Sequence, residues 1–319
     1  MILRGQDFGN VFNSSGARGF FGEGYWYHRL MQPFGLNYEG STFVAKTTTL
    51  HARAGNMPLD AKHRPAKLIP NCIVIKPWSG VVLNSVGLSG PGVKALLPEW
   101  SKRQGRFFIS FMSVEASMED RLREVEAFCE IIKPLLDAKG DQIGLQVNFS
   151  CPNVGHDPKK YAQLDDEMGE TFDITEALGI PTLAKVNVLF PMTTGLLAGI
   201  HTACDGIIVS NTIPWGQLPD KIDWRGLFGS DVSPIAKFGY GGGGLSGKPL
   251  LPLVCEWIQL ARTRGFYKSI VGGGGILSQD DAEEVLDSGA DAIEIGSVAL
   301  LRPWRVRGII SQVNRRTGN

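Results

Sequence analysis

The chain contains 319 residues, 43% of them hydrophobic, which is enough for a large buried core and argues against an intrinsically disordered protein. It carries 32 Lys and Arg against 32 Asp and Glu, so its formal net charge is zero and nothing in the composition favours nucleic acid or an anionic membrane surface as a partner. The five cysteines include no C-x-x-C pair, which argues against a disulfide framework and a zinc site and fits a reducing compartment.

The predicted strands are short runs of β-branched and aromatic residues, and most of them are followed by a helical stretch. The most apolar of these runs, residues 206–210, is typical of a strand that is buried on both faces. In chain order, we predict strands over residues 11–16, 42–47, 106–111, 143–149, 181–187, 205–211, 268–273 and 292–297.

Two helices have clear signals. Over residues 118–137, apolar side chains such as Val125, Phe128 and Ile132 recur at helical spacing with charged residues between them. Over residues 278–288, Ser278 is a suitable N-cap, acidic residues fill the first turn, and Gly289 stands where a C-terminal glycine belongs.

Alternating strands and helices predict the fold class. Eight such alternations favour an α/β fold of the (β/α)8 TIM-barrel type, formed by residues 1–319 as a single domain, although the count alone leaves a doubly wound sheet open. Two long connections, residues 48–101 and 212–251, follow predicted strands. In a barrel they would therefore lie at the C-terminal face of the strands, where active sites are built.

The segment Asn148-Phe149-Ser150-Cys151-Pro152-Asn153 directly follows a predicted strand and carries two amides and a thiol. Amides both donate and accept hydrogen bonds, so they suit a flat heterocycle with alternating C=O and N–H groups. The Cys151 thiol is a candidate nucleophile or proton acceptor. A lone cysteine is more often buried and inert, but its neighbours here favour a functional role.

Glycine-rich segments stand at the ends of the last two predicted strands, with Gly274 and Gly275 just after the seventh and Gly296 and Ser297 at the end of the eighth. Backbone N–H groups at such turns bind phosphate, and barrels commonly place a phosphate there. The plainer interpretation is that these glycines only permit tight turns. Residues 242–247 match G-x-G-x-x-G, but no strand pattern precedes them, so we interpret them as a flexible loop near a ligand and not as a dinucleotide site.

Two lysines end predicted strands, Lys46 and Lys185. Each could extend to solvent at the barrel rim. Beside a phosphate site, a cation that faces a bound ligand or a substrate carboxylate is the more attractive interpretation. The five histidines stand in no metal-binding or catalytic-triad spacing and are assigned no role.

Together these segments resemble the dihydroorotate dehydrogenase family. The similarity runs in order along nearly the whole chain. It comprises Lys46-Thr47-Thr48-Thr49, Asn84-Ser85-Val86-Gly87-Leu88, the Asn148 to Asn153 segment, Ser210-Asn211-Thr212, residues 243–250, Gly274-Gly275-Ile276 and Ile295-Gly296-Ser297.

The resemblance implies FMN-dependent oxidation of dihydroorotate to orotate in pyrimidine biosynthesis, with no metal. Cys151 would be the general base that removes the C5 proton while hydride passes from C6 to flavin N5. The substrate would contact Lys46, Asn84, Val86, Gly87, Leu88, Asn148, Asn153, Asn211 and Thr212. The FMN would contact Ser14, Ser15, Gly16, Lys46, Thr47, Asn148, Lys185, Ser210, Gly244, Ser246, Gly247, Gly274, Gly275, Gly296 and Ser297.

A cysteine base resembles the soluble class of the family, whereas the membrane-associated class has serine there and an N-terminal helical extension. No signal peptide or transmembrane run is apparent, so we expect a cytoplasmic protein. The resemblance to the soluble class also implies a homodimer. The class implies fumarate as electron acceptor, or NAD through a separate iron–sulfur flavoprotein subunit.

The sequence departs from the family pattern at Ser14, at Asn187, at residues 90–92 and in an apparent insertion over residues 215–232. These differences bear on substrate fit and partner surface more than on flavin binding. Three rivals stay open: an enzyme for another dihydropyrimidine, a tRNA-dihydrouridine synthase, which the neutral charge disfavours, and a phosphate-binding barrel without redox chemistry.

Overall fold

The structure of the protein, a computed structural model, describes residues 1–149, 164–190 and 204–318. Cys151 and Asn153 lie outside the described residues. Eight parallel strands form one sheet in the order β3-β14-β13-β10-β9-β8-β7-β4. These strands are β3 (Val11–Asn13), β4 (Phe43–Val44), β7 (Phe107–Phe111), β8 (Ile143–Asn148), β9 (Thr182–Val186), β10 (Gly206–Val209), β13 (Ser269–Gly273) and β14 (Ala292–Ile295). Each falls within a predicted strand, so the barrel is confirmed and the doubly wound alternative is wrong.

The barrel closes between its first two strands, β3 and β4. The backbone N–H of Thr42 donates to Val11 (2.8 Å), and that of Asn13 donates to Thr42 (3.1 Å). The buried side-chain amide of Asn13 then bonds to both backbone groups of Val44, donating to its C=O (2.9 Å) and accepting from its N–H (3.2 Å). A side chain therefore continues the hydrogen bonding where the backbone ladder stops.

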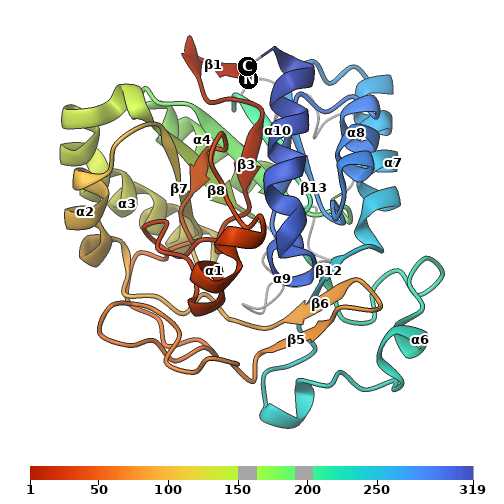
Figure 1. The fold of residues 1–319 in the computed structure, drawn as a ribbon. Coiled ribbons are helices and arrows are strands. Elements are labelled where there is room, and N and C mark those ends of the chain that lie inside the picture. The colour runs from red at the N-terminus through yellow and green to blue at the C-terminus, as the bar shows by residue number, and fades with distance from the viewer. Residues whose placement is uncertain (150–163, 191–203, 319) are drawn as a thin grey trace.

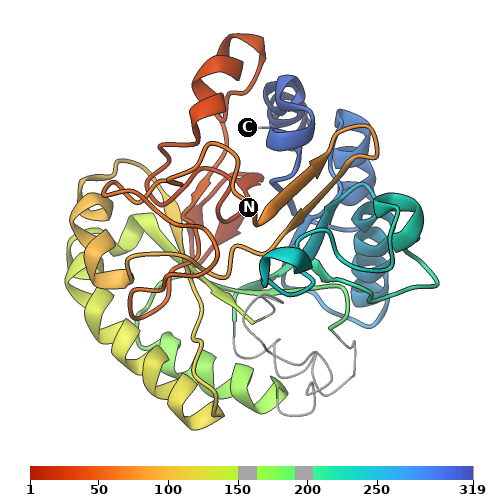
Figure 2. The same cartoon turned by 90° about the horizontal axis from the view of Figure 1, so that it is seen from below.

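Helices surround the barrel, as Figures 1 and 2 show. The outer helices are α2 (Val93–Lys102), α3 (Met118–Lys139), α4 (Leu164–Glu176), α7 (Leu250–Thr263), α8 (Gln279–Asp287) and α10 (Val306–Thr317). Both helices expected from the sequence are confirmed. Ser117 caps α3 by accepting from the N–H of Asp120 (3.0 Å), and Ser278 caps α8 by accepting from the N–H of Asp281 (3.2 Å).

The opposite end of the barrel from the loops is plugged by a hairpin that the sequence analysis missed. It consists of β1 (Ile2–Leu3) and β2 (Gln6–Asp7). Leu3 and Phe8 enter the same buried cluster as the barrel-interior residues Phe12, Val44, Phe108, Leu183, Ile208, Val271 and Ala292. The hairpin is only two residues long on each side, which is too short for a period-2 pattern to reveal.

The two long connections form a second, antiparallel sheet at the other end of the barrel. Its order is β11 (Ile213–Pro214), β12 (Gly244–Gly247), β6 (Val81–Asn84) and β5 (Ile73–Lys76). Figure 1 shows this sheet below the barrel, and Figure 2 looks onto it. The expected flexible loop over residues 242–247 is therefore wrong, because four of these residues are a strand held between β6 and β11.

Shorter elements complete the same end of the molecule. These are α1 (Trp26–Met31), α6 (Trp224–Phe228) and α9 (Val298–Leu301). The 3₁₀ turns in the described parts of the chain include η1 (Gln32–Phe34), η2 (Gly140–Gln142), η5 (Ala236–Phe238) and η6 (Pro303–Arg305). The apparent insertion, residues 215–232, contains α6 and is packed around its own aromatic residues. The Trp215 ring lies 4.8 Å from that of Trp224 and 5.1 Å from that of Phe228.

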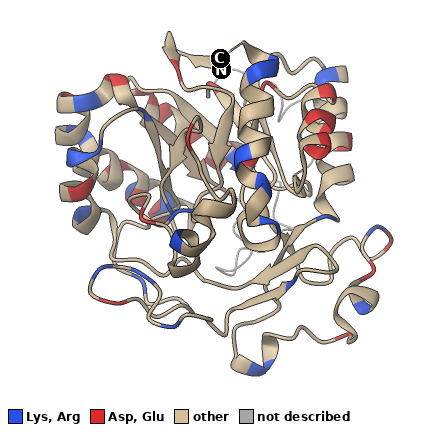
Figure 3. Cartoon of the chain, viewed as in Figure 1, with Lys and Arg blue, Asp and Glu red and all other residues tan. Residues whose placement is uncertain are grey.

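Charged residues of both signs lie on the outer helices in the view of Figure 3, in keeping with the neutral composition. Across the parts of the chain that the structure describes, each helix is too short or too polar to cross a membrane.

Candidate active site

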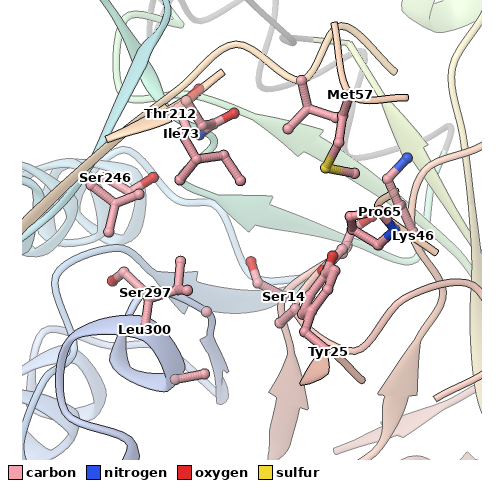
Figure 4. A pocket seen from close by; sticks show the side chains of 18 of the residues that line it. Ser14, Tyr25, Lys46, Met57, Pro65, Ile73, Thr212, Ser246, Ser297 and Leu300 are labelled. Carbon is pink, nitrogen blue, oxygen red and sulfur yellow. The ribbon is translucent and has the colours of Figure 1, made fainter. Parts of the chain in front are cut away.

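A cavity of about 1030 Å³ opens at the carboxyl ends of the barrel strands. Figure 4 shows side chains from both halves of the chain around one open space, with Ser14 and Lys46 on one side and Ser246 and Ser297 on another. The predicted residues that line it are Ser14, Ser15, Gly16, Lys46, Thr47, Asn84, Val86, Gly87, Leu88, Asn148, Lys185, Ser210, Asn211, Thr212, Ser246, Gly274, Gly275, Gly296 and Ser297. The structure thus brings together residues that are almost 300 positions apart in the sequence.

Strand alternation explains why polar side chains gather here. Side chains two residues apart on a strand point to the same face. A strand that places an apolar residue in the barrel interior therefore also points the residue two positions later inward, closer to the mouth of the barrel. Two residues beyond the apolar interior cluster come Ser14, Lys46, Ser110, Lys185, Ser210, Gly273 and Glu294. The interior therefore changes from an apolar layer to a polar one at the floor of the cavity.

A chain of hydrogen-bonded side chains crosses one side of this polar layer. The Thr47 hydroxyl lies 2.8 Å from that of Ser15 and 2.9 Å from that of Ser110, and Gln146 donates its amide to Ser110 at 2.8 Å. Ser15 also donates to the Ala45 carbonyl (2.9 Å). These bonds link the ends of β3 and β4 to β7 and β8 and fix the positions of hydroxyls that line the cavity.

Two of the four predicted amides hold each other in place. Asn211, just after β10, donates its side-chain amide to the Asn148 carboxamide oxygen at 2.9 Å. Its own oxygen accepts from the N–H of Thr212 (2.9 Å). Asn84, at the end of β6, lines the same cavity from the second sheet. Three carboxamides from three elements thus face one space.

Lys46 lies against the loop of residues 85–90, which includes the predicted substrate contacts Val86, Gly87 and Leu88. Its ammonium donates to the Ser89 carbonyl and sits 4.5 Å from the centre of the Phe20 ring. Leu88 adopts a positive φ of 57°, and the loop is braced from outside by Asn56, whose N–H donates to the Val86 carbonyl (2.8 Å). The cation and the backbone of residues 86–88 therefore line one part of the cavity.

Lys185 does not extend to solvent, so that interpretation is wrong. It is 4% exposed and forms two hydrogen bonds to the Glu294 carboxylate, at 2.6 and 2.8 Å. The sequence analysis missed Glu294 as a functional candidate. The signal was present, because a charged residue within the apolar run Ile293-Glu294-Ile295 needs a buried partner.

The turn after β13 is built for close backbone approach. Gly274 and Gly275 have φ of 132° and 83°, a region that residues with side chains rarely adopt. A β-carbon on Gly275 would lie 2.6 Å from the backbone nitrogen of Leu251, and one on Gly296 would lie 2.7 Å from the β-carbon of Ser14. Glycine at these places brings bare backbone to the cavity wall, which suits the phosphate of a nucleotide-like group.

The structure does not place Gly244 and Gly247 on the cavity wall. Both belong to β12, and a β-carbon on Gly247 would lie 2.2 Å from the Gly80 carbonyl oxygen. Close strand packing therefore accounts for Gly247, and the Ser246 side chain between them faces the cavity. Lining residues that the sequence analysis missed include Tyr25, Met57, Pro65, Ile73 and Leu300, none of which belongs to one of the recognised motifs.

Cysteines in the described parts of the chain are poor candidates for a base. Cys72, Cys129, Cys204 and Cys255 are buried, and burial raises the pKa of each thiol, to about 12 for Cys129 and Cys204. The cavity lining includes none of these four. Within the same described ranges, no cluster of three or more His, Cys, Asp or Glu side chains could hold a metal.

Comparison with known proteins gives a consistent result. The family model for dihydroorotate dehydrogenase matches residues 2–316. The chain is 28% identical over 300 residues to the catalytic subunit of dihydroorotate dehydrogenase B (NAD(+)) from Endomicrobium trichonymphae, covering 93% of this chain and 85% of that protein. It is 30% identical over 276 residues to dihydroorotate dehydrogenase A (fumarate) from Lactobacillus delbrueckii subsp. bulgaricus, covering 83% and 77%.

Solved structures share the fold. The crystal structure of DHODH from Eimeria tenella in complex with ferulenol superposes with a TM-score of 0.68 at 15% identity, covering 99% of this chain and 84% of that one. The ligand-free form from the same organism gives a TM-score of 0.63 at 16% identity, covering 86% and 78%.

Proposed function

Because the chain belongs to the dihydroorotate dehydrogenase family, whose members are oxidoreductases of pyrimidine biosynthesis, we propose that it oxidises dihydroorotate to orotate with bound FMN. The observation that carries the proposal is the cavity. It joins a glycine-lined wall, three carboxamides and a lysine at the mouth of one barrel. Its volume of about 1030 Å³ is at the upper end for small-molecule sites, which leaves room for a flavin with a second ring against it.

The residues present fit FMN. Gly274, Gly275, Gly296 and Ser297 would hold the phosphate through backbone N–H groups, and Lys185 would lie near the ring system. When bound, the flavin supplies a hydride acceptor, which is chemistry that no amino-acid side chain offers. The protein contributes orientation, charge and exclusion of water.

The amides would orient the pyrimidine ring. Asn84, Asn148 and Asn211 offer donors and acceptors in fixed positions, with Asn148 and Asn211 already bonded to each other. Lys46 and the backbone of residues 86–88 would bind the carboxylate. Orientation of this kind lowers the entropic part of the barrier. We propose Asn153 as a fourth amide and Cys151 as the base that takes the C5 proton.

The decisive experiment is an anaerobic titration of the purified holoprotein with dihydroorotate, followed by the bleaching of the oxidised flavin band. Cys151→Ala should retain its flavin but lose about 100-fold or more in the rate of reduction, the contribution expected of a general base. Cys255→Ala, which removes a buried thiol from helix α7, is the matched control and should reduce normally.

A near-normal rate of flavin reduction in Cys151→Ala would show that Cys151 is not the base. In the wild-type protein, the reduction rate should increase as the pH approaches the ordinary thiol pKa of about 8.5, because only the thiolate accepts a proton. Bleaching by a different dihydropyrimidine but not by dihydroorotate would favour the rival substrate class.

The finer assignments rest on the named relatives. Their names divide between fumarate and NAD(+), so the electron acceptor of this chain is proposed to be one of these, with NAD reached through a separate iron–sulfur flavoprotein subunit. Reoxidation of the reduced holoprotein by fumarate alone would identify fumarate as the acceptor. We also propose that the chain acts as a single barrel domain in a cytoplasmic homodimer.

A further inference from the structure

We infer that Glu294 is a positioning residue that holds Lys185 and offsets its charge, so that flavin bound here has a lower reduction potential than Lys185 alone would give it. The inference rests on the proposed FMN site and concerns a carboxylate to which neither the motifs nor the comparisons give a role. It begins from the two hydrogen bonds between Glu294 and Lys185, at 2.6 and 2.8 Å.

The pair crosses the interior of the barrel. Lys185 comes from β9 and Glu294 from β14, and two strands, β10 and β13, stand between them in the sheet. The contact passes over Gly273, where a β-carbon would lie 2.9 Å from the β-carbon of Glu294. Glycine at this inward position leaves the space that the Glu294 side chain uses.

Burial makes the charges matter. The side chains of Lys185 and Glu294 are 6% and 1% exposed, so water screens neither of them well. Both line the cavity, together with Ser210 and Gly274. The floor of the cavity therefore carries a pair with no net charge instead of a single buried cation.

The effect on a bound flavin follows from electrostatics. Reduction of a flavin, and addition of sulfite to its N5 atom, both place negative charge on the ring, which a nearby cation stabilises. A carboxylate that is paired with this cation weakens its stabilisation of the negative charge on the ring. A carboxylate that holds the lysine by two hydrogen bonds also prevents it from moving toward the ring.

The test measures the midpoint potential and the sulfite affinity of purified holoprotein, with sulfite itself as the probe. In Glu294→Gln, which keeps the shape but removes the charge, sulfite should bind at least tenfold more tightly. The potential should rise by about 30 mV, the equivalent of a tenfold change for a two-electron couple. Glu283→Gln is the control. It removes a carboxylate of the outer helix α8 that is paired with Arg316 of α10, so it should shift neither the potential nor the sulfite affinity.

A second background shows whether Glu294 acts through Lys185. In Lys185→Gln protein, adding Glu294→Gln should change sulfite binding clearly less than it does in the wild-type background, because the lysine that Glu294 holds is no longer there. An equally large change in both backgrounds would mean that Glu294 acts on the flavin directly, and would overturn the inference. So would an unchanged potential in Glu294→Gln accompanied only by lower stability, which is the result expected of a purely structural ion pair.

Failure of the proposed FMN site gives a different result, namely protein without a flavin band under any condition, and failure of the proposed substrate shows only in the dihydroorotate titration. If Glu294→Gln does not retain flavin while the wild type does, Glu294→Asp replaces it as the test variant. Aspartate keeps the charge but withdraws it from Lys185 by one methylene, so the potential should rise by a smaller amount. No rise in that variant would contradict the inference.

Discussion

Gly275 shows how a single residue can be specified by both backbone and neighbours. Its φ of 83° disfavours any side chain, and a β-carbon would lie 2.6 Å from the Leu251 nitrogen, on the helix that packs behind the turn. The repeated glycines after the last two predicted strands revealed this turn from sequence. The contact with Leu251 could not be predicted, because it depends on how α7 packs against the barrel.

We expect Gly275→Ala to lower both stability and flavin content. Its matched control is Gly241→Ala, where φ is 69° but nothing lies within 4 Å of the added carbon. The control should lose about 1–2 kcal/mol of unfolding free energy from the left-handed backbone alone and keep its flavin. Gly275→Ala should lose more than that and be isolated with at most a small fraction of its flavin. Equal flavin content in the two variants would show that the turn after β13 does not hold the cofactor.

Residue types were easier to predict than residue partners. Lys185 was identified from sequence as a costly charge within an apolar strand, and the structure supplies the reason that it is tolerated, Glu294. The two stand 109 positions apart, and only the barrel's inward layers bring them together. A period-2 pattern gives the face of each side chain, but not which of seven other strands will meet it.

Helix α1 is an element that local sequence does not specify. It has six residues, no fully buried side chain and no side-chain cap, so its stability comes from aromatic contacts. Just before it, Tyr25 donates to the Gly16 carbonyl at 2.5 Å and so connects the helix to the strand end at the cavity. The sequence analysis predicted no helix over these residues.

His28, on α1, makes the folding stability of the protein depend on pH. Burial, with a smaller effect of nearby Arg18, lowers its pKa from 6.5 to about 4. The unfolded chain therefore takes up a proton near pH 6.5, while the folded protein does so only near pH 4. The stability that comes from keeping His28 neutral is complete above pH 6.5 and is lost as the pH falls toward 4.

His28→Phe should reduce this acid-side loss. Phenylalanine keeps the ring contacts with Tyr27 and Tyr38, and the Nε2 atom that it deletes is buried without a hydrogen-bond partner among the described residues. Urea unfolding at several pH values between 4 and 7 should give a shallower dependence for the variant than for the wild type. Parallel curves would show that other groups cause the acid sensitivity.

The molecule as a whole depends on closing its barrel between β3 and β4. All eight barrel strands were predictable because each is a compact apolar run, whereas the closure was not. It relies on the Asn13 side chain in place of further ladder bonds to Val44. Both strands at the junction are short, three and two residues long. Few hydrogen bonds join them, so each one contributes a larger share of the stability of the closed barrel.

We expect Asn13→Leu to lower the unfolding free energy by about 3 kcal/mol, since it leaves the N–H and C=O of Val44 without this buried partner. Denaturant unfolding measures the change. Asn314→Leu, which removes a single exposed hydrogen bond to the Gly40 carbonyl, should cost less than about 1 kcal/mol. Similar losses in the two variants would mean that the backbone bonds through Thr42 suffice to close the barrel.

The second sheet has a consequence for how the protein is made. Strand β6 ends at Asn84, but its partner β12 begins at Gly244, and both border the cavity. During synthesis, the β5–β6 hairpin must wait while some 160 further residues leave the ribosome before its free edge is covered. A nascent chain stopped before β12 would expose that edge to other chains, and the ligand site would become complete only late in translation.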